Sequence, residues 1–209
     1  DAFTEVRDAF GAAKICGGGF GEVWIAEGTY HPTSGSDRTA SFRLASGLSV
    51  YGGFDGTETM RNERDFTVHQ SVLSGDVGAP IGNSDNSYHV VVADGVDATA
   101  VLDGVWIRDA RGDEPGGGIR MINGSPTLTN LQILNNTSGK GGGIYNEGGD
   151  PTLTNVLFYN NVTHSDQSRK GGGMYTAGGN PILVNVVFSG NTSWEQGAGL
   201  YCESGTVHV

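Results

Sequence analysis

The sequence lacks the features of several large protein classes. Only two of its 209 residues are cysteines, too few for a disulfide framework. Lys and Arg together number 12 against 23 Asp and Glu, and this net charge of −11 argues against nucleic acid, whose affinity is carried by cations. No apolar run approaches the roughly 18 residues of a membrane span, and no signal peptide opens the chain. We therefore expect a mature or trimmed chain without a membrane span.

Glycine, by contrast, is abundant and is arranged in a repeat. It supplies 36 of the 209 residues, against a usual share of about 7%. Four glycine clusters start 25, 30 and 26 residues apart, at Gly116, Gly141, Gly171 and Gly197. A proline follows at a fixed offset of ten in three of them, at Pro126, Pro151 and Pro181. A recurring period of this length indicates a solenoid or another repeat architecture.

Apolar residues and asparagines keep the same register as the glycines. The apolar sets are Leu128, Leu153 and Leu183; Leu131, Val156 and Val186; and Ile133, Phe158 and Phe188. The asparagine sets are Asn130, Asn155 and Asn185, and Asn136, Asn161 and Asn191. We expect the apolar sets to stack in the core, and the asparagine side chains to form ladders whose amides bond the coils above and below.

Within each repeat the apolar residues are two apart, as in Leu131-Gln132-Ile133, which is strand spacing. Proline and triple glycine exclude a helix through the repeat. Each repeat therefore predicts a coil of short strands, and successive coils stack in parallel at about 4.8 Å. The predicted fold class is all-β: a single-stranded parallel β-helix of about seven coils, right-handed by the general rule for parallel crossovers.

The two cysteines lie near opposite ends of this predicted stack. About six coils at about 4.8 Å separate Cys16 from Cys202 by about 29 Å, whereas a disulfide needs Cα atoms within about 7 Å. We therefore expect no bond between them. We interpret Cys202 as a buried ladder residue rather than a reactive thiol.

The first part of the chain is less regular. Phe3, Val6, Phe10 and Ala13 recur at helical spacing and predict an amphipathic helix over residues 3–14 that caps the first coil. Residues 55–65 are polar and predict a loop excursion. We expect a single β-helix domain over 1–209. It comprises a capping helix in 1–15, irregular coils with loop excursions in 22–115 and regular glycine-rich coils in 116–209.

Several segments resemble known bacterial proteins. The segments Val23-Trp24-Ile25-Ala26-Glu27-Gly28-Thr29-Tyr30 and Val50-Tyr51-Gly52-Gly53-Phe54 resemble the start of secreted right-handed β-helix proteins. The glycine-rich starts and the Phe-x-x-Asn pieces, Phe158 to Asn161 and Phe188 to Asn191, resemble the repeats of polymorphic outer-membrane proteins and related surface adhesins. The resemblance covers essentially the whole chain. It implies a pectin lyase-like fold and a secreted or cell-surface protein with a structural or adhesive role.

One outward-facing stripe is a candidate ligand-binding surface. Because Ile144, Met174 and Leu200 should point inward, the residues that follow them should point outward. With the neighbouring cations, the candidates are Arg120, Lys140, Tyr145, Lys170, Tyr175 and Tyr201. Exposed tyrosines flanked by cations suit a carbohydrate polymer, since the rings supply apolar area and the hydroxyls a polar handle. The alternative, which we favour, is that stacked tyrosines only stabilise the sheet.

A polysaccharide lyase or glycoside hydrolase on the same fold is the alternative function. A hydrolase needs two carboxylates about 5 to 9.5 Å apart, and a lyase needs carboxylates around calcium with a base nearby. Asp103, Asp109, Asp113 and Glu114 are close in sequence but do not recur between coils. No two histidines show metal-ligand spacing among His31, His69, His89, His164 and His208. We predict no catalytic residue, metal site or cofactor; calcium stays open as an alternative that no specific motif supports.

The last repeat is shorter than those before it. It starts at Gly197, and no amphipathic helix pattern follows it. We expect its apolar cross-section and strand edges to be open, which makes them a template for pairing. The chain is then either a fragment of a longer protein or self-associates through residues near Tyr201 to Val209. The other expected partner is a polysaccharide or a host or neighbouring cell surface.

Overall fold

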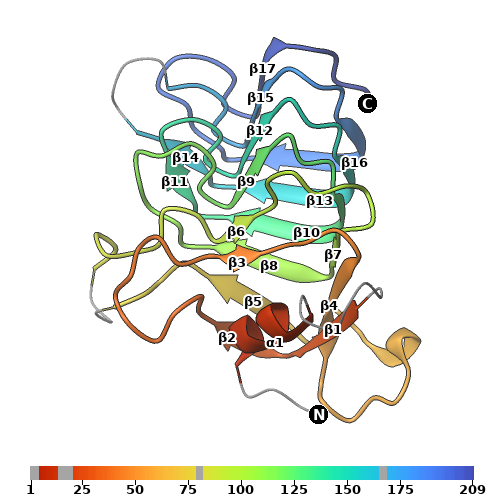
Figure 1. The fold of residues 1–209 in the computed structure, drawn as a ribbon. Helices are drawn as coiled ribbons and strands as arrows, with labels where there is room; N and C mark the ends of the chain where they lie inside the picture. Colours follow the sequence, from red (N-terminus) through yellow and green to blue (C-terminus); the bar gives the residue numbers. More distant parts are fainter. Residues whose placement is uncertain (1–4, 14–20, 79–81, 165–168) are drawn as a thin grey trace.

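The chain folds into a stack of short parallel strands with a helix at one end (Figure 1). The computed structural model describes residues 5–13, 21–78, 82–164 and 169–209. Its elements are α1 (Val6–Ala13), β1 (Gly21–Ala26), β2 (Gly28–Tyr30), β3 (Phe42–Arg43), β4 (Leu48–Phe54), η1 (Arg61–Glu63), β5 (Ser71–Ser74), β6 (Val91–Val92), β7 (Val101–Asp103), β8 (Val105–Arg108), β9 (Ile119–Ile122), β10 (Thr127–Leu134), β11 (Thr137–Ser138), β12 (Ile144–Glu147), β13 (Thr152–Tyr159), β14 (Val162–Thr163), β15 (Met174–Ala177), β16 (Ile182–Ser189) and β17 (Leu200–Ser204).

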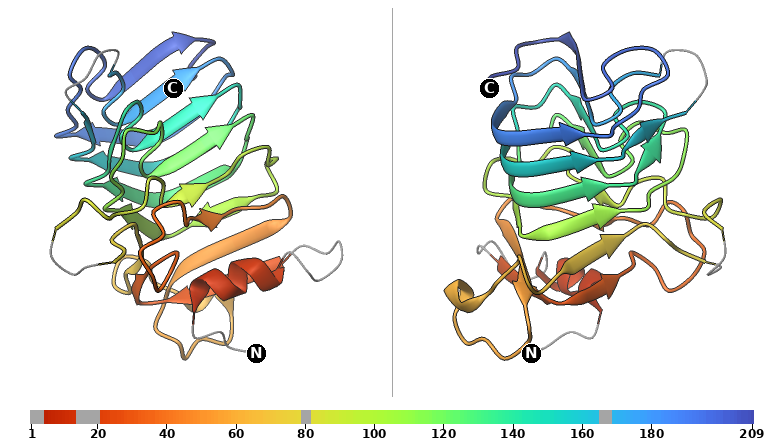
Figure 2. Two further views of the ribbon diagram at one scale, coloured as in Figure 1. Left: turned by 60° about the vertical axis from the view of Figure 1, so that its left-hand side comes forward. Right: turned by 180° about the vertical axis from the view of Figure 1, so that it is seen from behind.

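Successive coils stack in chain order from the red N-terminal end to the blue C-terminal end (Figure 2). One sheet runs β3-β6-β9-β12-β15-β17, a second includes the run β1-β4-β7-β10-β13-β16, and β11 pairs with β14 in a third. The long strand β10 pairs with β7 along its first half and with β8 along its second half. The result is an all-β solenoid of about 7 turns with parallel pairing, which confirms the predicted parallel β-helix.

The apolar ladders pair in the register that the sequence predicted. Leu128 pairs with Leu153, and Leu153 with Leu183. Phe158 and Phe188 are also in register, and their rings stack with centroids 4.7 Å apart. Phe158 is 0% exposed and belongs to the core, and the partly buried Phe188 packs against it. Burial of these ladders is the main driving force for stacking the coils.

An outer asparagine ladder turns the chain at the corner of each regular coil. Asn130, Asn155 and Asn185 have φ of 51°, 55° and 52°. This left-handed conformation is costly for most residues but is visited by asparagine. The Asn155 amide donates to the Asn130 side-chain oxygen at 3.0 Å, and Asn185 donates to Asn155 at 2.8 Å. The predicted bonding between coils is confirmed at this position.

A second asparagine ladder lies inside the solenoid. Asn136 donates to Asn161 at 3.0 Å, and Asn161 donates to Asn191 at 3.0 Å. Asn136 and Asn161 are both 0% exposed. Their amides also bond main-chain groups, as when Asn161 donates to the carbonyl of Ile133 at 2.7 Å. This second predicted ladder is therefore also confirmed, and it satisfies polar backbone that the coil buries.

The glycine clusters allow adjacent coils to approach closely. A Cβ on Gly143 would lie 2.5 Å from the carbonyl oxygen of Gly173 in the next coil and 2.8 Å from the Phe158 ring. No side chain fits there without shifting a coil. The repeat of triple glycines therefore follows from contact between backbones at every turn.

The predicted N-terminal helix is present as α1. Its Val6, Ala9 and Phe10 join the core cluster, and the Phe10 ring lies 5.7 Å from that of Phe42 in β3. The helix thus lies against the first coil, beside β1 and β3 (Figure 1). Phe3, which the helical pattern included, falls outside the described residues. Among the residues that are described, no helix is long and apolar enough to cross a membrane.

The prediction that Cys202 is buried is wrong. Its ladder position is as expected, because it pairs with the buried Thr176 of the preceding coil. It is nevertheless a free and exposed cysteine, because β15 is the one described strand with which β17 pairs. Cys16 lies outside the described residues. Self-association through this coil remains a prediction.

Candidate functional site

The predicted tyrosine stripe forms a continuous stack across three coils. Tyr145 pairs with Tyr175, and Tyr175 with Tyr201. The ring centroids are 5.3 Å apart in the first pair and 5.6 Å in the second. Arg120 precedes them in the ladder and forms an ion pair with Asp94 at 2.6 Å. All four residues thus occupy the equivalent positions that the sequence predicted.

The two lysines of the predicted site contact the stack. The Lys140 ammonium lies 3.4 Å from the Tyr175 hydroxyl and 5.0 Å from its ring centroid. The Lys170 ammonium lies 3.0 Å from the Tyr201 hydroxyl and 4.6 Å from that ring. Each lysine therefore packs on a tyrosine of the next coil, a cation–π arrangement that stabilises the stack itself.

Carboxylates accept hydrogen bonds from the stacked phenols. Tyr145 donates to Glu147 at 2.9 Å, and Tyr175 donates to Glu203. Partial burial, together with the adjacent Glu147 carboxylate, raises the pKa of Tyr145 to about 12. Burial and Glu203 likewise raise the pKa of Tyr175. Both hydroxyls therefore stay protonated at neutral pH and act as donors.

The structure contradicts one expectation about this stripe. Strand alternation predicts an exposed Tyr175 ring, but the residue is 0% exposed. It lies outside the apolar core cluster. Its burial comes instead from neighbours on the outer face, namely the Tyr145 and Tyr201 rings with Lys140 and Glu203. A ligand on this face can reach Tyr145 and Tyr201, which are half-buried, but not the middle ring.

The carboxylates considered for an enzyme make separate contacts. Asp103 forms an ion pair with Arg64 at 2.7 Å and accepts a bond from Asn130 at 2.8 Å. Asp109 lies 3.3 Å from the Ser74 hydroxyl, and burial raises its pKa. Asp113 lies 3.7 Å from Arg169. In the described part of the chain, no group of three or more His, Cys, Asp or Glu side chains could hold a metal ion.

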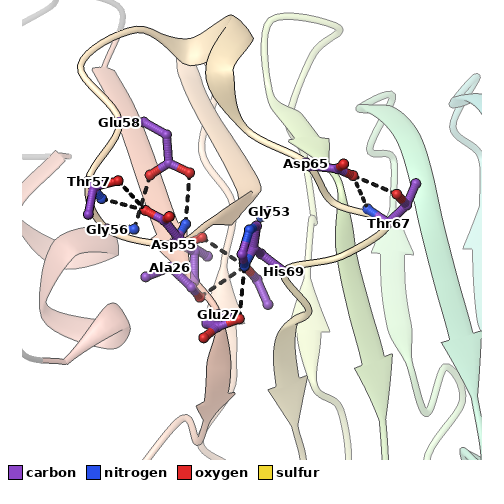
Figure 3. A network of polar contacts seen from close by, with 12 residues as sticks. Ala26, Glu27, Gly53, Asp55, Gly56, Thr57, Glu58, Asp65, Thr67 and His69 are labelled. Atoms are coloured by element: carbon purple, nitrogen blue, oxygen red, sulfur yellow. Dashed lines mark hydrogen bonds and ion pairs between the residues drawn. The ribbon is translucent and has the colours of Figure 1, made fainter.

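A loop over residues 55–70, between β4 and β5, carries a network of short-range polar contacts (Figure 3). Asp55 accepts bonds from the Thr57 amide at 2.7 Å and hydroxyl at 2.6 Å. Asp65 and Thr67 repeat this arrangement. Glu58 accepts the main-chain amides of Asp55 and Gly56. The loop's carboxylates are thus engaged in holding its own turns.

His69 ties this loop to the first coil. Its Nδ1 lies 2.9 Å from the Glu27 carboxylate (Figure 3). The hydrogen bond to Glu27 raises the pKa of His69, and the charges of Asp55 and Glu58 act in the same direction. No sequence pattern indicates this contact, because the two residues are 42 positions apart. The contact holds the loop against the first coil, and its strength depends on the charge of His69.

We expect the His69–Glu27 contact to titrate. Because the folded pKa of His69 is raised, the contribution of the contact to stability is fully present below the ordinary histidine pKa of about 6.5. This contribution is lost as pH rises through the pKa of His69 in the folded protein.

An NMR titration of the His69 ring should give a lower pKa in Glu27→Gln than in the parent chain. Glu22→Gln, which removes a carboxylate paired with Arg61 instead, is the control and should leave His69 unchanged. Identical His69 titrations in the parent and Glu27→Gln would contradict the assignment.

One segment of the chain matches a repeat found in known proteins. Residues 130–147 match the Chlamydia polymorphic membrane protein (Chlamydia_PMP) repeat. No curated protein and no solved structure matches the chain. The matched segment runs from the Asn130 corner of β10 through β11 and the triple-glycine turn to the end of β12. The chain is therefore a parallel β-solenoid repeat protein with a segment similar to that membrane-protein repeat.

Proposed function

We propose that the chain is a rigid structural and adhesive module at a bacterial cell surface. The observation that carries this proposal is the match of residues 130–147 to a polymorphic membrane protein repeat. The segment from Asn130 to Glu147 is repeated in register by the next coil, from Asn155 to Ala177. The matched unit is thus part of a periodic structure.

The contacts between coils support a module that keeps its shape while it presents its outer faces. The asparagine ladders, the phenylalanine stack and the tyrosine stack each link one coil to the next. Among the described residues, strands pair only with strands of adjacent coils, so length can be added without changing the cross-section. Such a solenoid suits display of a binding surface away from the cell. The separate contacts of Asp103, Asp109 and Asp113 offer no acid–base pair, and we do not propose an enzyme.

Surface display is tested on the cells that produce the protein. An antibody raised against the folded chain should label intact cells, and brief protease treatment of those cells should remove the label. An antibody against a cytoplasmic protein should label only permeabilised cells, which controls for leakage. Labelling that requires permeabilisation would show the proposal to be wrong.

A further inference from the structure

A groove of about 300 Å³ lies between the 55–70 loop and the outer face of three coils. The loop contributes Phe66 and Thr67, and the coils contribute side chains that include Trp106, Gln132, Asn155 and Leu157. The loop is packed directly on the coil corner. A Cβ on Gly104, whose φ is +76°, would lie 3.1 Å from Phe66 Cβ. The groove therefore has a fixed wall, and its volume is at the lower end of the range for ligand sites.

Three different side chains, one from each of three adjacent coils, form the floor of the groove. Trp106 of β8 pairs with Gln132 of β10, which pairs with Leu157 of β13. All three are half-buried and face outward, between neighbours that point into the core. An indole, an amide and an isobutyl group thus lie side by side at the strand spacing of about 4.8 Å. The floor offers apolar area with a polar group at its centre.

Amides with unused hydrogen-bonding capacity line the groove. Asn155 donates one bond to Asn130 and accepts one from Asn185. A side-chain amide has two N–H groups and two carbonyl lone pairs, so a donor and an acceptor are left over on Asn155. The Gln132 side chain makes no hydrogen bond to any described residue. These groups are available to ligand hydroxyls.

None of the described residues that line this groove carries a charge, although the chain has a net charge of −11. Asp103 and Arg64, which lie next to Asn130 and Gly104, form an ion pair with each other at 2.7 Å. A polyanion would find no cation here, and a cation would find no carboxylate. The groove is complementary to a neutral ligand that combines an apolar face with many hydroxyls.

We propose that this groove binds a neutral oligosaccharide. One sugar ring packs against the Trp106 indole, and its hydroxyls bond the amides of Gln132 and Asn155. An aromatic side chain beside amide donors and acceptors suits a sugar, which has both apolar C–H and polar O–H groups. The inference rests on the proposed surface function and gives that module a ligand class. It places binding on a different face from the tyrosine stack.

The test is an array of immobilised glycans that includes neutral hexose and N-acetylhexosamine oligomers together with uronic-acid and sialylated oligomers. The folded chain should bind members of the neutral set and not the acidic set. Trp106→Ala should weaken that binding by about tenfold or more, as truncation of a central tryptophan does at interfaces. Gln132→Glu keeps the side-chain length but puts a charge in the groove, and it should weaken binding to a similar extent.

Trp194→Ala is the matched control, because Trp194 is 66% exposed and does not line the groove. It should bind like the parent chain, and circular dichroism should show that all three variants melt as folded proteins. Binding restricted to acidic glycans, or neutral binding unchanged in both groove variants, would overturn the inference. So would binding to none of the arrayed glycans. The labelling of intact cells does not depend on this result, so failure of the groove and failure of the surface function are distinguishable.

Discussion

Replacing Phe158 with alanine should lower the free energy of unfolding by about 3 to 5 kcal/mol. Phe158 is fully buried, its ring stacks on Phe188, and it pairs in register with Ile133 on the other side. Gly143 packs against the same ring, since a Cβ placed there would lie 2.8 Å from it. The cavity left by alanine could therefore close only by moving two coils together, which the ladders oppose.

Denaturant unfolding followed by circular dichroism measures this change. For a domain of this size it corresponds to a fall in melting temperature of about 6 to 20 °C. Tyr159→Ala is the control, because the neighbouring tyrosine is 50% exposed and its truncation should cost about 0.5 kcal/mol or less. If Phe158→Ala unfolds at the same denaturant concentration as Tyr159→Ala, Phe158 is not a core ladder residue.

The coil architecture was predictable from the sequence because its determinants recur. A residue that must stack on its equivalents appears at the same offset in every repeat, so the spacing of Leu128, Leu153 and Leu183 is enough to predict a ladder. The same reasoning located the asparagine ladders. Strand alternation also placed the side chains of Tyr145, Tyr175 and Tyr201 on one outer stripe.

Exposure at individual positions was less predictable, because it depends on what covers a side chain. Alternation gives the direction in which Tyr175 points, but two neighbouring rings and the Lys140 and Glu203 side chains then bury it. Cys202 shows the reverse case, since its ladder position is an interior one but its strand has a neighbour on one side only.

The groove was not predicted from the sequence. Trp106 lies between the inward-facing Val105 and Ile107, so strand alternation gives the direction of its side chain but not what lies beside it. The wall formed by Phe66 could not be foreseen, because the 55–70 loop does not follow the repeat and packs on the corner at Gly104, far along the chain. The His69–Glu27 contact is non-local for the same reason. Candidate sites on this solenoid thus arise where an irregular loop meets a regular face.

The first Phe-x-x-Asn piece, Phe158 to Asn161, is buried at both of its ends. Phe158 packs in the core, and Asn161 is 0% exposed in the inner asparagine ladder. Neither side chain can contact a partner while the coil is intact. These two residues therefore serve the fold, and the adhesive contacts that we propose would fall to the outer faces.

Replacing Asn161 with alanine should cost about 3 to 6 kcal/mol, because several buried polar groups lose their partner and each unsatisfied group costs about 1 to 3 kcal/mol. The Asn161 amide donates to the Ile133 carbonyl and to Asn191, and its oxygen accepts both the main-chain and side-chain N–H of Asn136.

Asn160→Gly is the matched control. It removes the adjacent exposed asparagine, whose φ of 54° glycine adopts readily, and should change stability by about 0.5 kcal/mol or less. Denaturant unfolding of the two variants at neutral pH measures the difference. The control also removes a hydrogen bond between coils, from Asn160 to Asn135 at 2.8 Å, but that bond is exposed. Equal stabilities would mean that the buried amide of Asn161 contributes no more than this exposed one, and that the inner ladder does not hold the coils together.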